Sequence, residues 1–252
     1  MNRLPIKAVL FDLDDTLWPI VPVIVRAEAV LYAWLQTHAP AVAQSHTIDS
    51  LRERRMALMA TQPRYRIDLW ALRHAGLTEA FHASGAELAR VDDAMAVFAT
   101  ARNAVTPYDD VLPALLRLNQ KVALGTISNG FADLDAIGLS SHFRVSIAAH
   151  RFGTAKPDPA IFHAACTALG IEPEQAVYVG DDPLLDVDGA QKAGLRAVWM
   201  NRFDRSLPGH IAPDASCSNL FELEDWLQGR CAAPTSGTPD ASIKLAGSHG
   251  AG

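Results

Sequence analysis

An unbroken apolar run that ends in acidic residues constrains this chain more than any other feature. Residues 7–18 read KAVLFDLDDTLW, in which Ala8–Phe11 show no polar alternation. Such a run is typical of a strand buried on both faces of a parallel sheet. Asp12, Asp14 and Asp15 follow where that strand would end, and open α/β sheets bind ligands at the carboxyl ends of their strands. In extended chain Asp12 and Asp14 would point into one pocket.

Two neighbouring carboxylates need a cation between them, or one of them must hold a proton. A metal-held carboxylate can act as a nucleophile, and a carboxyl group with a raised pKa can act as a general acid. The structural alternative is that Asp, Asp and Thr after a strand cap a helix or shape a turn. The rest of the chain has to decide between these readings.

Composition narrows the class of function. The formal charge of −6 and the lack of any Lys/Arg run argue against a nucleic-acid or membrane-surface partner, while a small anionic substrate remains compatible. Cys166, Cys217 and Cys231 are widely spaced, so neither a disulfide framework nor a zinc site is indicated. We find no signal-peptide core and no segment that approaches a membrane span, and we expect a cytoplasmic protein, monomer or homodimer.

Helical periodicity follows Trp18 and continues to about Pro107. The pattern predicts helices over 23–37, 49–60, 68–75 with Gly76 as C-cap, 78–89 and 92–104. Strand and helix then alternate, with strands expected over 122–127, 143–149, 176–179 and 197–200 and helices over 110–119, 130–137, 159–169, 184–193 and 220–227. Such alternation predicts a doubly wound parallel sheet of the α/β class.

These patterns predict two domains and a tail. We expect an α/β core domain from residues 1–18 and 107–228, a helical cap domain over 19–106, and a disordered tail over 229–252, where Ala, Pro, Thr, Ser and Gly predominate.

Polar groups follow each of the later strands. Ser128 and Asn129 stand where one strand ends, and with a helix expected from Gly130 they predict a phosphate-sized anion site. Ser128 could instead only cap that helix. Lys156 lies before a helix cap; it is either an ordinary solvated charge or the cation that neutralises phosphoryl oxygens and Asp12.

The stretch VYVGDDPLLDVDGA supplies the last set of acids. Gly180 permits a turn, and Asp181 is placed to bind a hard divalent cation such as Mg²⁺, which prefers oxygen ligands. Asp182 could cap the next helix, Asp186 could bind through water or orient Lys156, and Asp188 is expected to be a solvated helix residue. Each group alone is weak evidence, and together they favour one site.

Together, these polar residues resemble the motifs of a known family. Asp12–Thr16, Ser128, Lys156 with Pro157, and Gly180-Asp181 with Asp186 resemble motifs one to four of the haloacid dehalogenase (HAD) superfamily. The helical insertion resembles the C1 cap of its subfamily I. The resemblance implies a Rossmann-like, HAD-like parallel core of strand order 5-4-1-2-3, and a phosphatase that depends on Mg²⁺.

The resemblance also implies roles. Asp12 would be the nucleophile that forms an aspartyl phosphate, Asp14 the general acid and base, and Thr16 a residue that orients Asp14. Ser128, Asn129 and Lys156 would bind the phosphoryl group, and Asp12, Asp181 and the backbone carbonyl of Asp14 would bind the metal.

Several departures bear on activity within the superfamily. Haloalkanoate dehalogenases lack the second Asp, so Asp14 favours a phosphatase. Phosphonatases use a cap Lys, and residues 19–107 contain none. Asp15 stands where many members have Gly.

The stretches FDLDDTLW, PVIVRAE and VGDDPLLDVDGAQKAGLRAVW are similar to those of bacterial phosphatases of flavin mononucleotide and of the phosphorylated riboflavin precursor. A small phosphorylated metabolite of that kind is therefore the expected substrate, and sugar-phosphate or nucleotide phosphatases are the alternative. A phospho-accepting regulator is the alternative of a different class. The candidates for specificity are Trp18, Arg26, Arg64, Arg66, Trp70 and Arg73, each of which could equally serve packing or surface charge.

Overall fold

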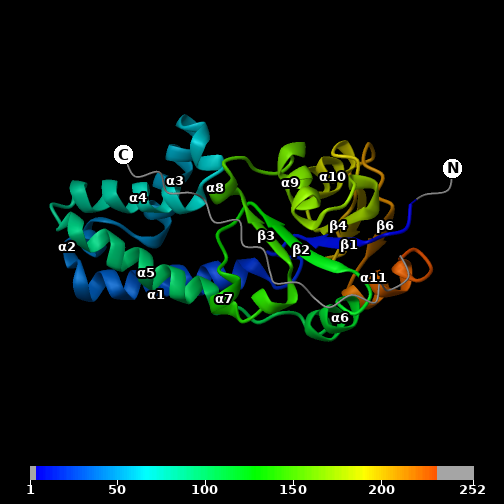
Figure 1. The fold of residues 1–252 in the computed structure, drawn as a ribbon. Coiled ribbons are helices and arrows are strands. Elements are labelled where there is room, and N and C mark those ends of the chain that lie inside the picture. The colour runs from blue at the N-terminus through cyan, green and yellow to red at the C-terminus, as the bar shows by residue number, and fades with distance from the viewer. Residues whose placement is uncertain (1–3, 232–252) are drawn as a thin grey trace. The chain divides into compact units, whose positions relative to one another are not determined.

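A parallel six-stranded sheet forms the centre of the first of two compact units (Figure 1). The computed structural model describes residues 4–231; of the predicted tail over 229–252, residues 232–252 lie outside them. The strand order is β3-β2-β1-β4-β5-β6, which contains the expected order 5-4-1-2-3 and adds a strand at one edge. The strands are β1 (Ala8–Phe11), β2 (Ala123–Ser128), β3 (Val145–Ala148), β4 (Ala176–Gly180), β5 (Arg196–Met200) and β6 (Ala215–Cys217).

The register of the central strands places Asp12 at the edge of the sheet where the motifs meet. Phe11 is opposite Thr126 of β2 on one side and Val179 of β4 on the other. The backbone N–H of Asp12 still donates to the carbonyl of Val179, at 2.9 Å. The chain therefore leaves the sheet between the carboxyl ends of β2 and β4, because both neighbours run parallel to β1.

Helices cover both faces of this sheet. Figure 1 shows α9 (Pro159–Leu169) and α10 (Gly189–Lys192) over one face, and α6 (Val111–Leu118) and α11 (Leu220–Leu227) over the other. A short helix, α8 (Ala149–Phe152), follows β3. The strands β1 and β4 are buried along their whole length, as a sheet with two covered faces requires. The predicted α/β class is confirmed.

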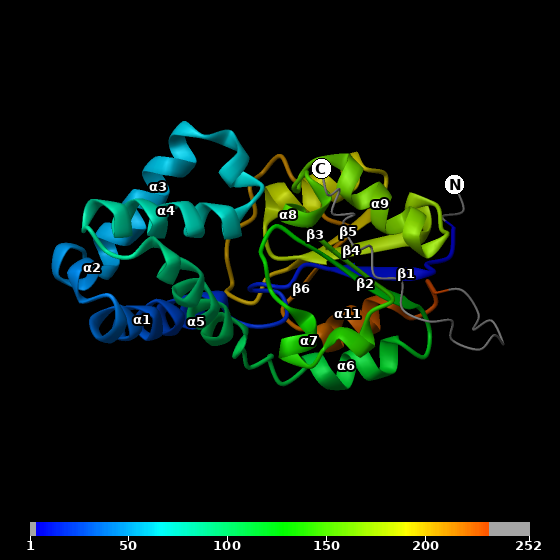
Figure 2. The same ribbon diagram turned by 60° about the vertical axis from the view of Figure 1, so that its left-hand side comes forward.

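The second unit is helical and comprises residues 20–105 and 130–137. Its helices are α1 (Ile20–His38), α2 (Pro40–Ser45), α3 (Ile48–Thr61), α4 (Leu69–Ala83), α5 (Val91–Asn103) and α7 (Leu134–Ile137). Figure 2 shows α1 beside α5 and α3 beside α4. The unit has its own apolar core, in which Leu31, Leu35, Phe81 and Phe98 are buried.

Three expectations about helices differ from the structure. The predicted break at Gly76 is wrong, because α4 continues through it to Ala83. A Cβ at Gly76 would lie 3.0 Å from Cγ of Arg55, so the glycine allows close packing with α3 rather than a helix end. The helix expected from Gly130 begins only at Leu134, and residues 130–137 group with the helical unit although we assigned them to the core domain.

The expectation that no segment approaches a membrane span also needs correction. Helix α1 has 19 residues and a mean hydropathy of 1.3, so by length and composition it is long and apolar enough to cross a membrane. In this fold its residues Ala27, Leu31 and Leu35 belong to the core of the helical unit. A core helix of a folded domain and a signal sequence near the N-terminus both pass the same test, so one such helix is weak evidence for a membrane span.

Candidate active site

The loop after β1 is a tight turn that is closed by its own backbone. Asp14 and Trp18 form a β-bridge, and the N–H of Asp15 donates to the carbonyl of Trp18 at 2.7 Å. Asp15 has a φ of 60°, in the left-handed region that glycine occupies most easily and that Asp tolerates better than most residues. This explains how Asp15 can stand at a position where many members of the superfamily have Gly.

Trp18 fixes the side chain of Asp14. Its indole Nε1–H donates to Oδ1 of Asp14 at 2.8 Å. Trp18 is fully buried, so it supports a carboxylate instead of offering a ring to a substrate, as we had considered. Thr16, to which the resemblance assigns this orienting task, is fully buried, and among the described residues its hydroxyl has no hydrogen-bond partner.

Lys156 lies at the centre of the site and is 5% exposed. Its Nζ donates to Oδ1 of Asp12 at 2.6 Å, to Oδ1 of Asp186 at 2.7 Å and to the hydroxyl of Tyr178 at 2.8 Å. All three N–H donors of the ammonium group are thus used, which is what a buried Lys requires. The ordinary solvated charge that we considered for Lys156 is therefore not what the structure shows.

Asn129 holds the backbone of Lys156. Its Oδ1 accepts from the N–H of Lys156 at 2.8 Å, and its Nδ2 donates to the carbonyl of Lys156 at 3.0 Å. The side chain predicted to bind phosphate is therefore engaged in positioning the lysine. Ser128 is buried at the end of β2, but no helix starts there, so the expected helix N-terminus does not exist at this point.

Tyr178 was not anticipated from the sequence. It lies in β4, and besides accepting from Lys156 it donates to the carbonyl of Ile127 at 2.9 Å. In the sequence it reads as one more apolar strand residue, and only its phenol group signals a polar task, since a buried Tyr hydroxyl usually finds a partner.

Three carboxylates gather beside the lysine. Oxygens of Asp12, Asp181 and Asp186 lie within 4.8 Å of one another. Gly180 makes this possible, because a Cβ there would lie 2.3 Å from the carboxylate of Asp186. Asp182, as considered, caps the next turn by accepting from Leu184 and Leu185.

Burial and mutual repulsion shift the pKa values of these acids upwards. Burial raises the pKa of Asp12 well above its usual range, Lys156 opposes this, and the charge of Asp186 adds to it. For Asp181, burial and then Asp186 raise the pKa to about 6, against hydrogen bonding from Arg205. Burial lowers the pKa of Lys156, but the charges of Asp12 and Asp186 outweigh burial and raise this pKa, so the ammonium group stays charged.

Residues 6–194 match the model of the haloacid dehalogenase-like hydrolases. The chain belongs to this family.

Curated relatives of this family member are named phosphatases. Phosphoserine phosphatase of Thermus thermophilus is 31% identical, with 86% of this chain and 97% of the relative covered. The 5-amino-6-(5-phospho-D-ribitylamino)uracil phosphatase of Escherichia coli is 30% identical, over 86% of this chain and 94% of the relative. The expected enzyme class, a phosphoric monoester hydrolase, is confirmed.

Solved structures show the same fold. A structure titled 2-haloacid dehalogenase from Pseudomonas syringae is 37% identical, covers 88% of this chain and 98% of its own, and has a TM-score of 0.83. A HAD phosphatase from Thermococcus onnurineus is 27% identical, covers 90% and 100%, and has a TM-score of 0.64.

Of the cap residues considered for specificity, two pack within the helical unit and two border a recess. Arg26 donates to the carbonyls of Ala101 and Ala104 at the end of α5. Arg73 is buried, stacks 3.5 Å from the ring centroid of Phe98, and lies 3.6 Å from the carboxylate of Glu28. Both therefore serve the packing of the helical unit.

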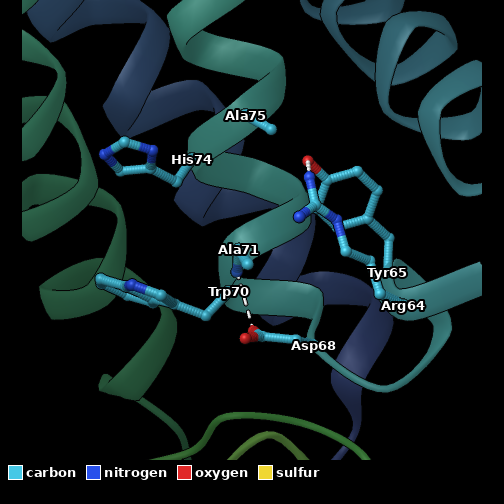
Figure 3. A pocket seen from close by; sticks show the side chains of 7 residues that line it. All are labelled: Arg64, Tyr65, Asp68, Trp70, Ala71, His74 and Ala75. Atoms are coloured by element: carbon cyan, nitrogen blue, oxygen red, sulfur yellow. Dashed lines mark hydrogen bonds between the residues drawn. The ribbon is translucent and has the colours of Figure 1, made fainter. Parts of the chain in front are cut away.

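The second group lines a recess. Arg64 and Trp70 border a cavity of about 460 Å³ in the helical unit (Figure 3), lined by Arg64, Tyr65, Asp68, Trp70, Ala71, His74 and Ala75. The indole of Trp70 packs edge-on against Phe131. Arg66 is exposed.

Proposed function

We propose that this protein is a Mg²⁺-dependent phosphatase that hydrolyses a small phosphorylated metabolite through an aspartyl phosphate on Asp12. The observation that carries the proposal is the position of the Asp12 carboxylate. Lys156 binds one of its oxygens, and Asp181 and Asp186 lie against it. A buried carboxylate that faces two other carboxylates and one ammonium group is arranged for phosphoryl chemistry rather than for stability.

The residues present fit a magnesium ion. Lys156 donates to Oδ1 of Asp12, and Arg205 donates to Oδ2 of Asp181. Both oxygens of Asp186 also accept hydrogen bonds, one from Lys156 and the other from the backbone N–H of Asp182. The second oxygens of Asp12 and Asp181, with the carbonyl of Asp14, would then hold the ion, and Asp186 would support the site through Lys156. When bound, the ion supplies positive charge that offsets the phosphoryl oxygens.

The residues of the chain then have distinct tasks. The carboxylate oxygen of Asp12 forms a bond to phosphorus as the bond to the leaving oxygen breaks, and Asp14 gives that oxygen its proton. Ser128 would hold the phosphoryl oxygens, and Lys156, whose N–H groups donate to Asp12, Asp186 and Tyr178, would contribute its positive charge beside them. In the second half, Asp14 takes a proton from water, the water oxygen bonds to phosphorus, and Asp12 is released with inorganic phosphate.

The presence of Asp14 supports phosphate ester hydrolysis over dehalogenation. A halide ion leaves without a proton, whereas an alcohol leaves poorly as its anion. In this chain Asp14 is held by Trp18, so the acid is oriented and not merely present. A dehalogenase would not need that arrangement.

We further propose that the substrate is flavin mononucleotide or the phosphorylated riboflavin precursor, with sugar phosphates and nucleotides as the alternatives. Support comes from the relative named 5-amino-6-(5-phospho-D-ribitylamino)uracil phosphatase, and from Arg64 and Trp70, which both border the recess in the helical unit. The relatives differ in named substrate at nearly equal identity, so identity alone does not choose among them.

A phosphate-release assay tests the activity. Purified protein with Mg²⁺ should release phosphate from p-nitrophenyl phosphate and from a member of a panel that contains flavin mononucleotide, sugar phosphates and nucleotides. Asp12→Asn should abolish turnover and keep the circular dichroism spectrum, while Asp188→Asn, which alters an acid paired only with Lys192 in the described contacts, should keep the activity. Full activity of Asp12→Asn would exclude the covalent mechanism, and a stable phosphoprotein without turnover would favour the regulator.

A further inference from the structure

The loop that follows β5 reaches back to the catalytic turn through Arg202. Its Nε donates to the carbonyl of Thr16 at 2.7 Å, and its two Nη atoms bind both oxygens of Asp110 at 3.0 and 2.9 Å. The side chain is 6% exposed, and its guanidinium stacks 4.0 Å from the ring centroid of Tyr108. Each of the three guanidinium nitrogens of this arginine therefore donates to a defined partner.

The partner Asp110 is itself fixed. Its Oδ2 also accepts from the backbone N–H of Leu220, at the start of α11, at 2.6 Å. Burial raises the pKa of Asp110, but the hydrogen bonds from Arg202 and Leu220 outweigh burial, so the pKa is below its ordinary value and the carboxylate stays ionised. Arg202 is thus anchored to the ends of two helices on one face of the sheet.

The turn that Arg202 holds contains the proposed general acid. Tyr108 donates its N–H to the carbonyl of Leu17 at 3.0 Å, so the carbonyls of Thr16 and Leu17 both accept hydrogen bonds from outside the turn. Asp14 and Trp18 form the bridge across this turn, and Trp18 holds the Asp14 carboxylate. A shift of the carbonyl of Thr16 would move the bridge and with it the proton donor.

We infer that Arg202, fixed by Asp110, is a positioning residue that sets the geometry of Asp14 for proton transfer to the leaving group. The inference rests on the proposed function, because it requires Asp14 to act as the acid. Removing the arginine should leave Asp12, Lys156 and phosphoryl binding in place. The loss of activity should be largest for substrates whose leaving group needs a proton.

The dependence on the leaving group tests this role. Nitrophenolate leaves with little need for a proton, whereas an alkoxide needs one. The value of kcat/KM reports the first phosphoryl transfer to Asp12 and not the later hydrolysis. We therefore compare kcat/KM for p-nitrophenyl phosphate with that for the most active alkyl phosphate of the panel.

Arg202→Lys is the main variant, because it keeps a positive charge beside Asp110 but cannot bind two carboxylate oxygens and the carbonyl of Thr16 together. We expect kcat/KM for the alkyl phosphate to fall about tenfold more than that for p-nitrophenyl phosphate, with KM for the latter little changed. Arg202→Met should show the same ratio with a lower midpoint of thermal unfolding. Equal losses on both substrates in Arg202→Lys, or no loss, would overturn the inference.

Two further variants separate the possible failures. Arg117→Met removes another two-point arginine contact, to Glu224 of α11, and should lower stability without changing the substrate ratio. A changed ratio in that control would assign the effect to general loss of structure and would also overturn the inference. Asp14→Asn should show the largest change of ratio. If Asp14→Asn affects both substrates equally, the proposed general acid fails, which is a different result from failure of Arg202.

Discussion

At the scale of single residues, the site depends on groups that support the reacting ones. Asp12 and Lys156 carry the proposed chemistry, but Tyr178, Asn129 and Trp18 each fix a catalytic side chain or its backbone. Catalytic groups need to be held within a fraction of an ångström of their working positions, and such supporting hydrogen bonds provide that restraint. Substitutions of the supporting residues should therefore reduce turnover without removing any reacting atom.

Tyr178→Phe is the sharpest case. It removes one acceptor from the ammonium group of Lys156 and one donor to the carbonyl of Ile127, both buried. We expect kcat to fall about tenfold and the free energy of unfolding to fall by roughly 1–3 kcal/mol. Tyr32→Phe is the matched control, since that hydroxyl also donates to backbone carbonyls, in the helical unit. It should cost stability at unchanged kcat; an equal loss of kcat in both variants would contradict the role of Tyr178.

The raised pKa of Asp181 predicts that the stability of the protein depends on pH. Burial, and then repulsion from Asp186, raise its pKa to about 6, so in the metal-free protein the folded state binds this proton more tightly than the unfolded state does. Stability should therefore fall as the pH rises from about 4 to above 6, by roughly 2–3 kcal/mol. Urea unfolding in the presence of a chelator, compared between the native chain and Asp181→Asn, measures this contribution. A native chain with the same pH slope as the variant would contradict the shift.

At the scale of elements, the helical unit is organised around a buried carboxylate. Glu28 of α1 pairs with Arg52 and Arg55 of α3 and with Arg73 of α4, and its side chain is 4% exposed. One charge thus ties together three helices. The pairing explains why Arg55 and Arg73 are buried in a unit that has few other acids in its core.

Glu28→Gln should unfold this unit more easily. The change leaves the guanidinium groups of Arg55 and Arg73 buried without a counter-charge, and breaking such a buried pair costs roughly 3–5 kcal/mol. Proteolysis at low protease concentration should then cut within residues 20–105 faster than in the native chain. Glu79→Gln, which removes an exposed partner of Arg54, should have an effect of at most about 1 kcal/mol. Unchanged cleavage of Glu28→Gln would show that the pair does not hold the unit.

At the scale of the whole molecule, the acids concentrate where the parallel strands end. A net charge of −6 is modest, yet three carboxylates share one small volume in the core unit. A cation that binds them in the folded state alone stabilises that state by mass action. Metal binding should consequently be visible in stability as well as in activity.

Magnesium should raise the midpoint of thermal unfolding. At a concentration of one hundred times Kd, the expected stabilisation is about 2.7 kcal/mol, and a chelator should reverse it. Asp181→Asn should abolish the Mg²⁺ response, whereas Asp188→Asn should retain it. A thermal midpoint of the native chain that does not respond to Mg²⁺ would contradict the metal site independently of any activity assay.

The sequence by itself determined the fold class and nominated the proposed reacting groups. Apolar runs such as Ala8–Phe11, each followed by polar residues, are local patterns, and β1, β4 and α11 appeared where those patterns predicted them. The positions of Asp12 and Asp181, directly after the neighbouring strands β1 and β4, follow from the same rule, because parallel strands place their carboxyl ends at one edge. Lys156 lies in the loop after α8.

The tertiary structure decided which side chains hold those groups. From the sequence, Trp18 is a candidate for substrate specificity, Gly76 is a predicted helix end and Arg202 carries no prediction; packing gives each its partner. Arg202 and the carbonyl of Thr16 are 186 positions apart, and Tyr178 meets Lys156 across a strand crossover. A hydrogen bond between distant residues leaves no periodic trace in the chain, since it depends on direction and on a distance near 3 Å that only the folded sheet sets.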